Sequence, residues 1–405
     1  MPASAVPAKR RPAMNRLHRL GELLAVFGKL GTLGFGGPAP LIAMTEDEVV
    51  ARRGWLSRER FLDLVGATNL IPGPNAAEIA MHVGYLRAGW AGLLTAGAAL
   101  IVPAALITAV FAWAYVAYGA LPQVAPFLYG AKPAVLAVIV AAIGRLGRTA
   151  AQGWRLVAVG AAVTAASLCG VNEIAALFAG GLVGMCWLRL AGRSAGPAAA
   201  AAGAAVALGS KDAWAGAAAT AAAVTGAAAL SLTALGLFFL KVGATLYGSG
   251  YVLVAFLQGG LVHEHGWLTQ QQLLDAVAIG QFTPGPLLTT ATFIGYVLLG
   301  LPGAIIATAA IFLPSFVFVA ALGPVLPRLR RSAWAGAFLD AVNICSVGLM
   351  AAVAAKLAGA TLGSWPAWAI AIGAAILGLR WKVNAAWLVL GGAGLGWLLS
   401  PWANL

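Results

Sequence analysis

The sequence predicts an all-α integral membrane protein, an inverted-topology repeat of two homologous helical halves with broken or re-entrant helices. Three observations predict it: a strongly apolar composition, a motif pattern that occurs twice, and basic residues that exchange sides between the two copies. Of 405 residues, 61% are hydrophobic and 9% are charged, and the mean hydropathy is +0.90. Apolar runs of about 18 residues or more recur along the chain, as membrane helices require. Their lack of strict alternation indicates helices rather than a membrane barrel.

The formal net charge of +13 does not indicate a nucleic-acid partner, because the basic residues stand in small groups at the ends of apolar runs. The lipid bilayer is the expected surrounding, and a homodimer is left open. The three cysteines have no Cys-x-x-Cys spacing, so neither a disulfide framework nor a metal knuckle is expected. His263-Glu264-His265 fits a solvated turn better than a metal site. The basic segment 1–19 is expected to be a cytoplasmic tail rather than a cleaved signal.

A repeat covers nearly the whole chain. Pro72-Gly73-Pro74 recurs as Pro284-Gly285-Pro286, an offset of 212 positions. Other positions match at the same offset: Phe27 with Phe239, Lys29 with Lys241, Gly36 with Gly248, Gly54-Trp55-Leu56 with Gly266-Trp267-Leu268, and Asp63 with Asp275. The repeat units are residues 20–192 and 232–400. Residues 193–231 form an Ala/Gly-rich linker, whose part from 214 onward is long enough for an extra transmembrane helix.

The loop charges indicate that the two units lie in opposite orientations. In the first unit the connection 119–125 carries no basic residue, whereas its second-unit equivalent carries Arg328, Arg330 and Arg331. Because basic loops stay in the cytoplasm, the units are inverted, which is typical of secondary transporters. We therefore expect a cytoplasmic N-terminus and a C-terminus on the opposite side.

Each Pro-Gly-Pro is expected to break its helix, since proline removes a backbone donor and clashes with the preceding turn. Each broken segment either crosses the membrane, for about thirteen spans, or returns as a hairpin, for about nine spans. The sequence leaves both arrangements open. Ser57 and Thr269 are predicted N-caps, with a capping box only at Thr269, and Asp63 and Asp275 are expected in the first turns of their helices.

Phe35-Gly36-Gly37-Pro38, Gly54-Trp55-Leu56, the Pro-Gly-Pro-Asn run at 72–75, Gly84-Tyr85 and their second-half equivalents resemble the chromate transporter family. The resemblance implies two homologous halves of opposite orientation in the cytoplasmic membrane, and chromate efflux that confers chromate resistance. The second half departs from the pattern, with Tyr247-Gly248-Ser249-Gly250 for Phe-Gly-Gly-Pro and Leu287 for Asn75. Two equal sites are therefore not expected, and sulfate or another oxyanion is the alternative substrate.

A tetrahedral dianion at membrane depth needs hydrogen-bond donors and positive potential, which helix N-termini supply. We expect new helices to begin after both Pro-Gly-Pro segments and to point their N-termini at one anion near the midplane. A plain kink is the alternative. The predicted substrate-binding residues in these two motif regions are Gly36, Gly37, Pro72, Gly73, Pro74 and Asn75, with Gly248, Pro284, Gly285, Pro286, Thr289 and Thr290 in the second half.

Lys29 and Lys241 lie within apolar segments at equivalent positions, where a cation is costly and usually functional. We hypothesise that they attract the dianion, with snorkelling to the surface as the alternative. Glu78 and His82 lie four residues apart on one helix face and are candidates for proton coupling, with a simple partner of the helix dipole as the alternative for Glu78.

An intramembrane enzyme is disfavoured, because the sequence shows no paired carboxylates and no Ser/His or Cys/His pairing of recognisable spacing. The Gly-x-x-x-x-Gly-Lys-Ser/Thr loop that binds nucleotides is absent as well. We expect no cofactor and no metal. The prediction is a secondary carrier that exports chromate and is coupled to protons or a counter-ion, with an anion channel as the alternative.

Overall fold

The computed structural model describes residues 15–190, 230–248, 250–322 and 332–399, and every regular element in this part of the chain is a helix. In the described residues, the first half runs from α1 (Arg16–Leu33) to α7 (Glu173–Leu190). The second half runs from α10 (Leu232–Thr245) to α17 (Ala385–Leu399). The expected linker helix falls almost wholly outside these residues. So do most of the N-terminal tail, the basic run at 328–331 and the C-terminal end.

The elements of the first half follow one order, which the second half repeats. The first half contains, after α1, α2 (Pro38–Glu46), the π-helical turn η1 (Asp47–Arg52), α3 (Arg58–Thr68), α4 (Asn75–Tyr118), α5 (Ala125–Ala150) and α6 (Trp154–Leu168). The second half contains, after α10, η2 (Gly250–Val252), α11 (Leu253–Leu257), η3 (Gln258–Glu264), α12 (Gln270–Phe282), η4 (Leu287–Thr289), α13 (Thr290–Leu322), α15 (Ala333–Thr361) and α16 (Trp365–Arg380). The structure thus contains an internal repeat.

Five helical segments of the described chain are long and apolar enough to cross a membrane. They are α4, α5, α7, α15 and the continuous stretch of η4 and α13, Leu287–Ala321. Shorter apolar helices accompany them, among them α6, α10, α16 and α17. The protein is therefore a multi-pass membrane protein.

The α4 segment reverses direction near its N-terminal end. Ala88 and Gly89 have non-helical backbone angles, with φ of 63° at Gly89. A Cβ on Gly84 would collide with the carbonyl oxygen of Gly92. In a straight helix residues this far apart are separated by about 12 Å. The segment 75–87 therefore folds back onto the long arm of α4, and glycine permits both the positive φ and the close approach.

The second half repeats this reversal. Leu299 and Gly300 have the same non-helical angles, with φ of 63° at Gly300, and the backbones of Gly295 and Gly303 meet in the same way. Each half therefore contributes one short arm that follows its Pro-Gly-Pro segment and one long helix.

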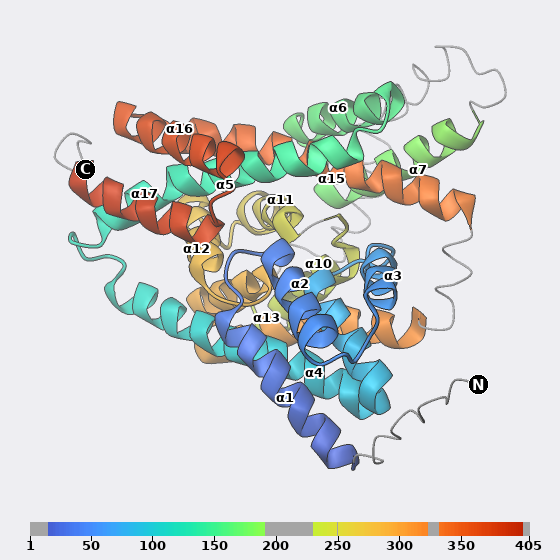
Figure 1. Ribbon diagram of the computed structural model, residues 1–405. Helices are drawn as coiled ribbons and strands as arrows, with labels where there is room; N and C mark the ends of the chain where they lie inside the picture. The colour runs from blue at the N-terminus through green and yellow to red at the C-terminus, as the bar shows by residue number, and fades with distance from the viewer. Residues whose placement is uncertain (1–14, 191–229, 249, 323–331, 400–405) are drawn as a thin grey trace, which may run out of the picture.

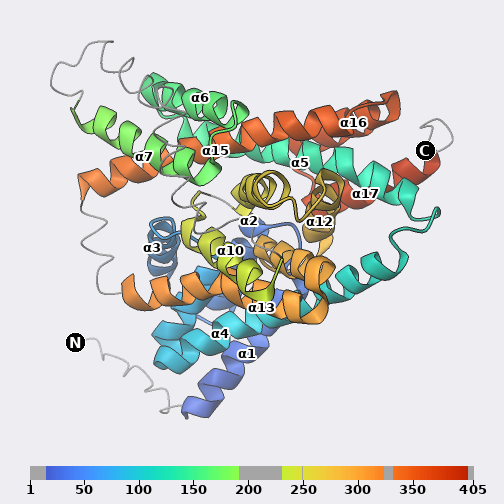
Figure 2. The same cartoon turned by 180° about the vertical axis from the view of Figure 1, so that it is seen from behind.

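The two halves are intertwined rather than placed side by side. Helix α5 of the first half packs against α15, α16 and α17 of the second, while α15 packs against α6 and α7. Figures 1 and 2 show these six helices as one layer, with α1, α4 and α13 in an opposite layer and α2, α10, α11 and α12 between them. Both Pro-Gly-Pro segments adjoin elements of this middle region.

The predicted helix starts are confirmed where the cap chemistry was specific. The Ser57 hydroxyl accepts from the Arg60 amide, and Thr269 forms the full capping box with Gln272. The placement of Asp63 and Asp275 in first turns was wrong. Both lie in the second turn, because α3 and α12 begin directly after their caps, at Arg58 and Gln270.

Candidate functional site

Each Pro-Gly-Pro segment forms a buried turn between two helices, as expected. Helix α3 ends at Thr68 and α4 begins at Asn75, directly after the first copy. In the second copy, α12 ends at Phe282 and the 3-10 turn η4 comes before α13, so the new helix begins less abruptly than predicted. The φ angles of Gly73 and Gly285 are 143° and 91°. These conformations favour glycine, which explains the motif's central residue.

The two turns are hydrogen-bonded to opposite halves. The Gly73 amide donates to the carbonyl oxygen of Leu246 at 2.8 Å, and the Gly285 amide donates to the carbonyl oxygen of Gly34 at 2.9 Å. Gly34 and Leu246 follow α1 and α10 and are equivalent positions of the repeat. The site therefore combines backbone from both halves through two reciprocal hydrogen bonds.

The first turn faces a buried carboxyl group. Glu78 lies in the first turn of α4 and is 0% exposed. A Cβ on Gly73 would strike both the Glu78 carboxylate and the Ser315 hydroxyl of α13, so the three groups adjoin one another. Within the described residues, neither Glu78 oxygen has a hydrogen-bond partner. A carboxyl buried without a partner is costly, which is a reason to expect a function for it.

His82 lies one helical turn beyond Glu78 and is also buried. Its Nε2 atom has no hydrogen-bond partner among the residues that the structure describes. The structure thus places the two predicted proton-coupling residues on the same buried arm, 75–87. Their role in coupling stays a prediction.

The second turn has different surroundings. Gly285 faces Ala104 of α4 at the position where Gly73 faces Ser315. Thr289 and Thr290 are buried, and their hydroxyls donate to the carbonyl oxygens of Pro286 and Leu287 at 2.9 and 2.8 Å. These protons are engaged in local bonds. To donate to an anion, each hydroxyl must first leave its carbonyl.

The remaining predicted donors lie around the same turns. The Asn75 amide donates to Asn69 Oδ1 at 2.6 Å across the first turn. Gly36 abuts the Asn384 side chain, which donates to the Phe35 carbonyl at 3.3 Å. Gly37 approaches the hydroxyl of buried Tyr251, and Gly248 approaches Ser346. Gly36 and Gly37 thus admit polar side chains of the second half, whereas Gly248 admits one of its own half. A direct contact of these glycines with an anion stays a prediction.

Comparison with known proteins identifies the family. The chromate transporter family profile matches residues 21–185 and again residues 233–397. The chain belongs to the chromate transporter family. Similar proteins include the chromate transport protein of Cupriavidus metallidurans, 32% identical over 93% of this chain and 92% of the relative. The chromate transport protein of Pseudomonas aeruginosa is 33% identical over 94% and 92%.

A third relative extends the similarity to another organism. The probable chromate transport protein of Synechococcus elongatus is 30% identical over 91% of each chain. No solved structure matches this transporter. The resemblance inferred from the motifs is therefore confirmed, and the family is one of transporters rather than enzymes.

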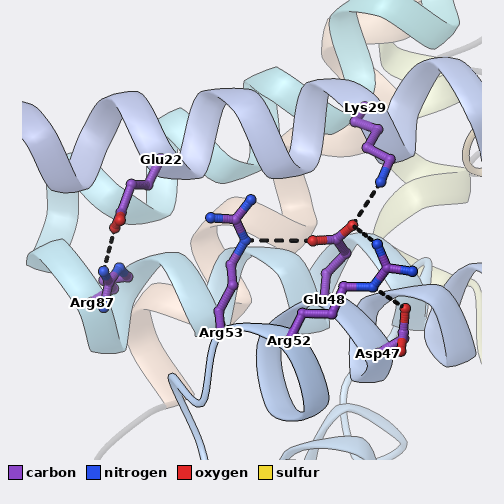
Figure 3. Close-up of polar contacts among 7 residues, drawn as sticks. All are labelled: Glu22, Lys29, Asp47, Glu48, Arg52, Arg53 and Arg87. Carbon is purple, nitrogen blue, oxygen red and sulfur yellow. Dashed lines mark hydrogen bonds and ion pairs between the residues drawn. The ribbon is translucent and has the colours of Figure 1, made fainter.

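Lys29 of this transporter lies in a charge cluster rather than at the Pro-Gly-Pro turns (Figure 3). Its Nζ lies 2.7 Å from Glu48 Oε1, and Arg52 and Arg53 also contact the Glu48 carboxylate. The hydrogen bond from Lys29 holds the pKa of Glu48 below its usual value, against the opposing effect of burial. The same region contains the Glu22–Arg87 ion pair, which links α1 to the reversal of α4 (Figure 3).

Lys241, the second-half equivalent of Lys29, is exposed. Lys29 is exposed as well, but it contacts Glu48, whereas Lys241 lies within electrostatic reach of Glu173 of α7. Lys29 is neutralised by a carboxylate on η1, and attraction of a dianion by either lysine stays a prediction.

Several polar residues of the core were missed at the sequence level. Ser315 follows Pro314 in the middle of an apolar run. Gln258 and Gln281 are buried, with no hydrogen-bond partner for their amides in the described chain. Lys132 pairs with Asp275 at 3.2 Å between the two halves. Lys132 had a detectable signal, since it is a lysine inside the apolar run of α5, whereas single hydroxyl and amide residues carry no such signal.

Proposed function

We propose that this chain is a secondary carrier that exports chromate across the cytoplasmic membrane and thereby confers chromate resistance. The observation that carries the proposal is the pair of buried Pro-Gly-Pro turns, each hydrogen-bonded to the opposite half, in a member of the chromate transporter family. Family membership supports chromate as the substrate. The broken helices at the interface of two repeats support a carrier, because such sites are typical of secondary transporters.

Units 20–192 and 232–400 are, in this proposal, inverted repeats whose broken segments are re-entrant hairpins. The reversals at Gly89 and Gly300 support hairpins over crossing helices, since each returns a short arm along a long helix. The cytoplasmic N-terminus and the opposite placement of the C-terminus follow from the basic loops under the positive-inside rule. The 193–231 linker would then connect the two orientations.

Anion binding in this proposal uses the amide groups and helix N-termini that follow Pro74 and Pro286. Unpaired N–H groups at the start of α4 and a partial positive charge there suit an oxyanion. Asn75 adds an amide donor on the first side. Glu78 adds a carboxyl that takes up and releases a proton, so that export is coupled to the proton gradient.

The test is chromate flux in proteoliposomes that contain the purified full chain. We expect radiolabelled chromate to accumulate when a proton gradient is imposed, with excess unlabelled chromate competing better than sulfate. Sulfate competing better would assign the substrate to sulfate. Flux that ignores the proton gradient and simply follows the anion gradient would indicate a channel and contradict the carrier.

A further inference from the structure

A cavity of about 510 Å³ opens between the two halves, away from the Pro-Gly-Pro turns. Its walls come from the C-terminal end of α4 and the first turns of α5 in the first half, and from α12 and the α15–α16 connection in the second. The lining residues used below are Tyr115, Tyr129, Lys132, Asp275, Thr361 and Ser364. A solute inside this cavity would contact both halves at once.

The cavity wall contains an ion pair that joins the halves. Lys132 Nζ of α5 lies 3.2 Å from Asp275 Oδ1 of α12, and the Tyr115 hydroxyl donates to Asp275 Oδ2 at 3.0 Å. The side chains of Lys132 and Asp275 are only 17% and 6% exposed. Both charges are therefore largely removed from water, and each is costly without the other.

The groups around this pair suit an oxyanion. Besides the ammonium and the Tyr115 hydroxyl, the cavity presents the hydroxyls of Tyr129 and Ser364, which bond to each other. Thr361 adds a buried hydroxyl that has no partner among the described residues. Asp275 is the only carboxylate among the lining residues. The Asp275 side-chain carboxylate thus occupies the position that a free anion would take.

The lysine–aspartate pair is not repeated at the equivalent positions of the repeat. Asp63, the first-half equivalent of Asp275, is an exposed residue of α3. After the Pro-Gly-Pro segments the repeat offset becomes 211 positions, as Phe127-Leu128 and Phe338-Leu339 show, so the position equivalent to Lys132 is Asn343. The pair is therefore not a by-product of the repeat.

We propose that this cavity is a second anion site and that the Lys132–Asp275 pair is its gate. An entering tetrahedral dianion displaces the Asp275 carboxylate from Lys132 and Tyr115 and binds to the same donors. When the anion leaves, the carboxylate returns and the pair closes again. This inference rests on the proposed function for its substrate class, a dianion such as chromate or sulfate, and it places a release site on the face of the connections 119–125 and 362–364.

Equilibrium binding of radiolabelled chromate and of sulfate to the purified full chain tests the gate. Lys132→Gln removes the ammonium, so we expect the Kd to rise about tenfold or more. Asp275→Asn removes the competing carboxylate, so we expect the Kd to fall about threefold to tenfold, with slower release of the anion. The double variant should bind as weakly as Lys132→Gln. Asp63→Asn is the matched control and should leave the Kd unchanged.

The opposite directions of the two changes distinguish a gate from a structural bond. If both single variants weaken binding equally, or neither changes it while size-exclusion profiles remain normal, the gate is refuted. The neutral double variant keeps the test valid if one single variant fails to fold. Chromate uptake by wild-type proteoliposomes is measured in parallel. If uptake is intact and neither single variant changes the Kd, only the gate is rejected. If the Kd values of the two variants shift in opposite directions but the wild type shows no uptake, only export is rejected. Binding of neither anion by the wild type rejects both.

Discussion

At the first Pro-Gly-Pro turn the glycine faces Glu78 and Ser315, whereas at the second turn it faces Ala104. Both turns have a positive φ at the glycine and an amide bonded to the opposite half. The repeat therefore preserves geometry but not chemistry. One turn carries an ionisable group and the other an apolar wall.

Because of this difference, two repeated turns can have different roles in transport. In the proposed function, helix N-termini attract an anion at both turns, because the backbone provides their charge. A proton can be carried only where a titratable side chain is present. We therefore expect substitutions at the first turn to change coupling and equivalent substitutions at the second turn to leave it unchanged.

The largest effect is expected for Glu78→Gln. The amide cannot take up a proton, so proton-driven chromate uptake should fall by at least about tenfold, the equivalent of about 1.4 kcal/mol. Uptake driven by a chromate gradient alone should fall less. The measurement is uptake into proteoliposomes with and without an imposed pH gradient.

Glu59→Gln is the control for this variant, because Glu59 is exposed on α3. It should retain full proton dependence. Full proton dependence in Glu78→Gln itself would remove Glu78 from the coupling mechanism.

A smaller effect is expected for Ser315→Ala. Its hydroxyl adjoins the Glu78 carboxyl and can donate to the ionised form. Because removal of this donor disfavours the ionised carboxyl, the pH profile of uptake should move upward.

The reciprocal variant Ala104→Ser tests the second turn. Its new hydroxyl meets no carboxyl and can bond back to its own helix, so the pH profile should stay in place. Equal shifts in both variants would show that the two turns share one chemistry after all.

The smallest effect is expected for the ion pair between Lys29 and Glu48. Because the folded-state pKa of Glu48 is lowered from 4.5, its ion pairs stabilise the protein above that value and are lost as the pH falls through the lowered pKa. Lys29 is half exposed, so Glu48→Gln should lower stability by only about 0.5–1 kcal/mol at pH 7.

Thermal unfolding in detergent at pH 7 and near pH 4 measures the contribution of the Glu48 ion pairs to stability. The difference between wild type and Glu48→Gln should shrink at the lower pH, and exposed Glu59→Gln should show no such trend. A difference that grows on acidification would contradict the assigned sign.

Much of the scaffold could be predicted from the sequence because its signals are local. Each Pro-Gly-Pro segment separates two helices, and Ser57 and Thr269 cap the helix that follows them, so these features are confirmed. The site's polar partners could not be predicted in the same way. Ser315 meets Glu78, and Lys132 meets Asp275, only because α4, α5, α12 and α13 pack across the two halves. Position in the sequence does not encode those contacts.

The two lysines show that a repeated residue is not enough to predict a repeated role. Equal spacing suggested equal roles for Lys29 and Lys241, yet Glu48 lies beside Lys29, and the equivalent second-half residue is Gly260. Repetition of one residue does not carry its neighbours along.

The crossed hydrogen bonds of Gly73 and Gly285 have a consequence for biogenesis. The first half leaves the ribosome well before Leu246 exists, so its Pro-Gly-Pro turn must wait in the bilayer with an amide that lacks its final acceptor. Neither half supplies the carbonyl acceptor for the amide of its own Pro-Gly-Pro glycine. A chain that ends at residue 192 would thus remain incompletely folded and be a substrate for membrane quality control, rather than a smaller functional transporter.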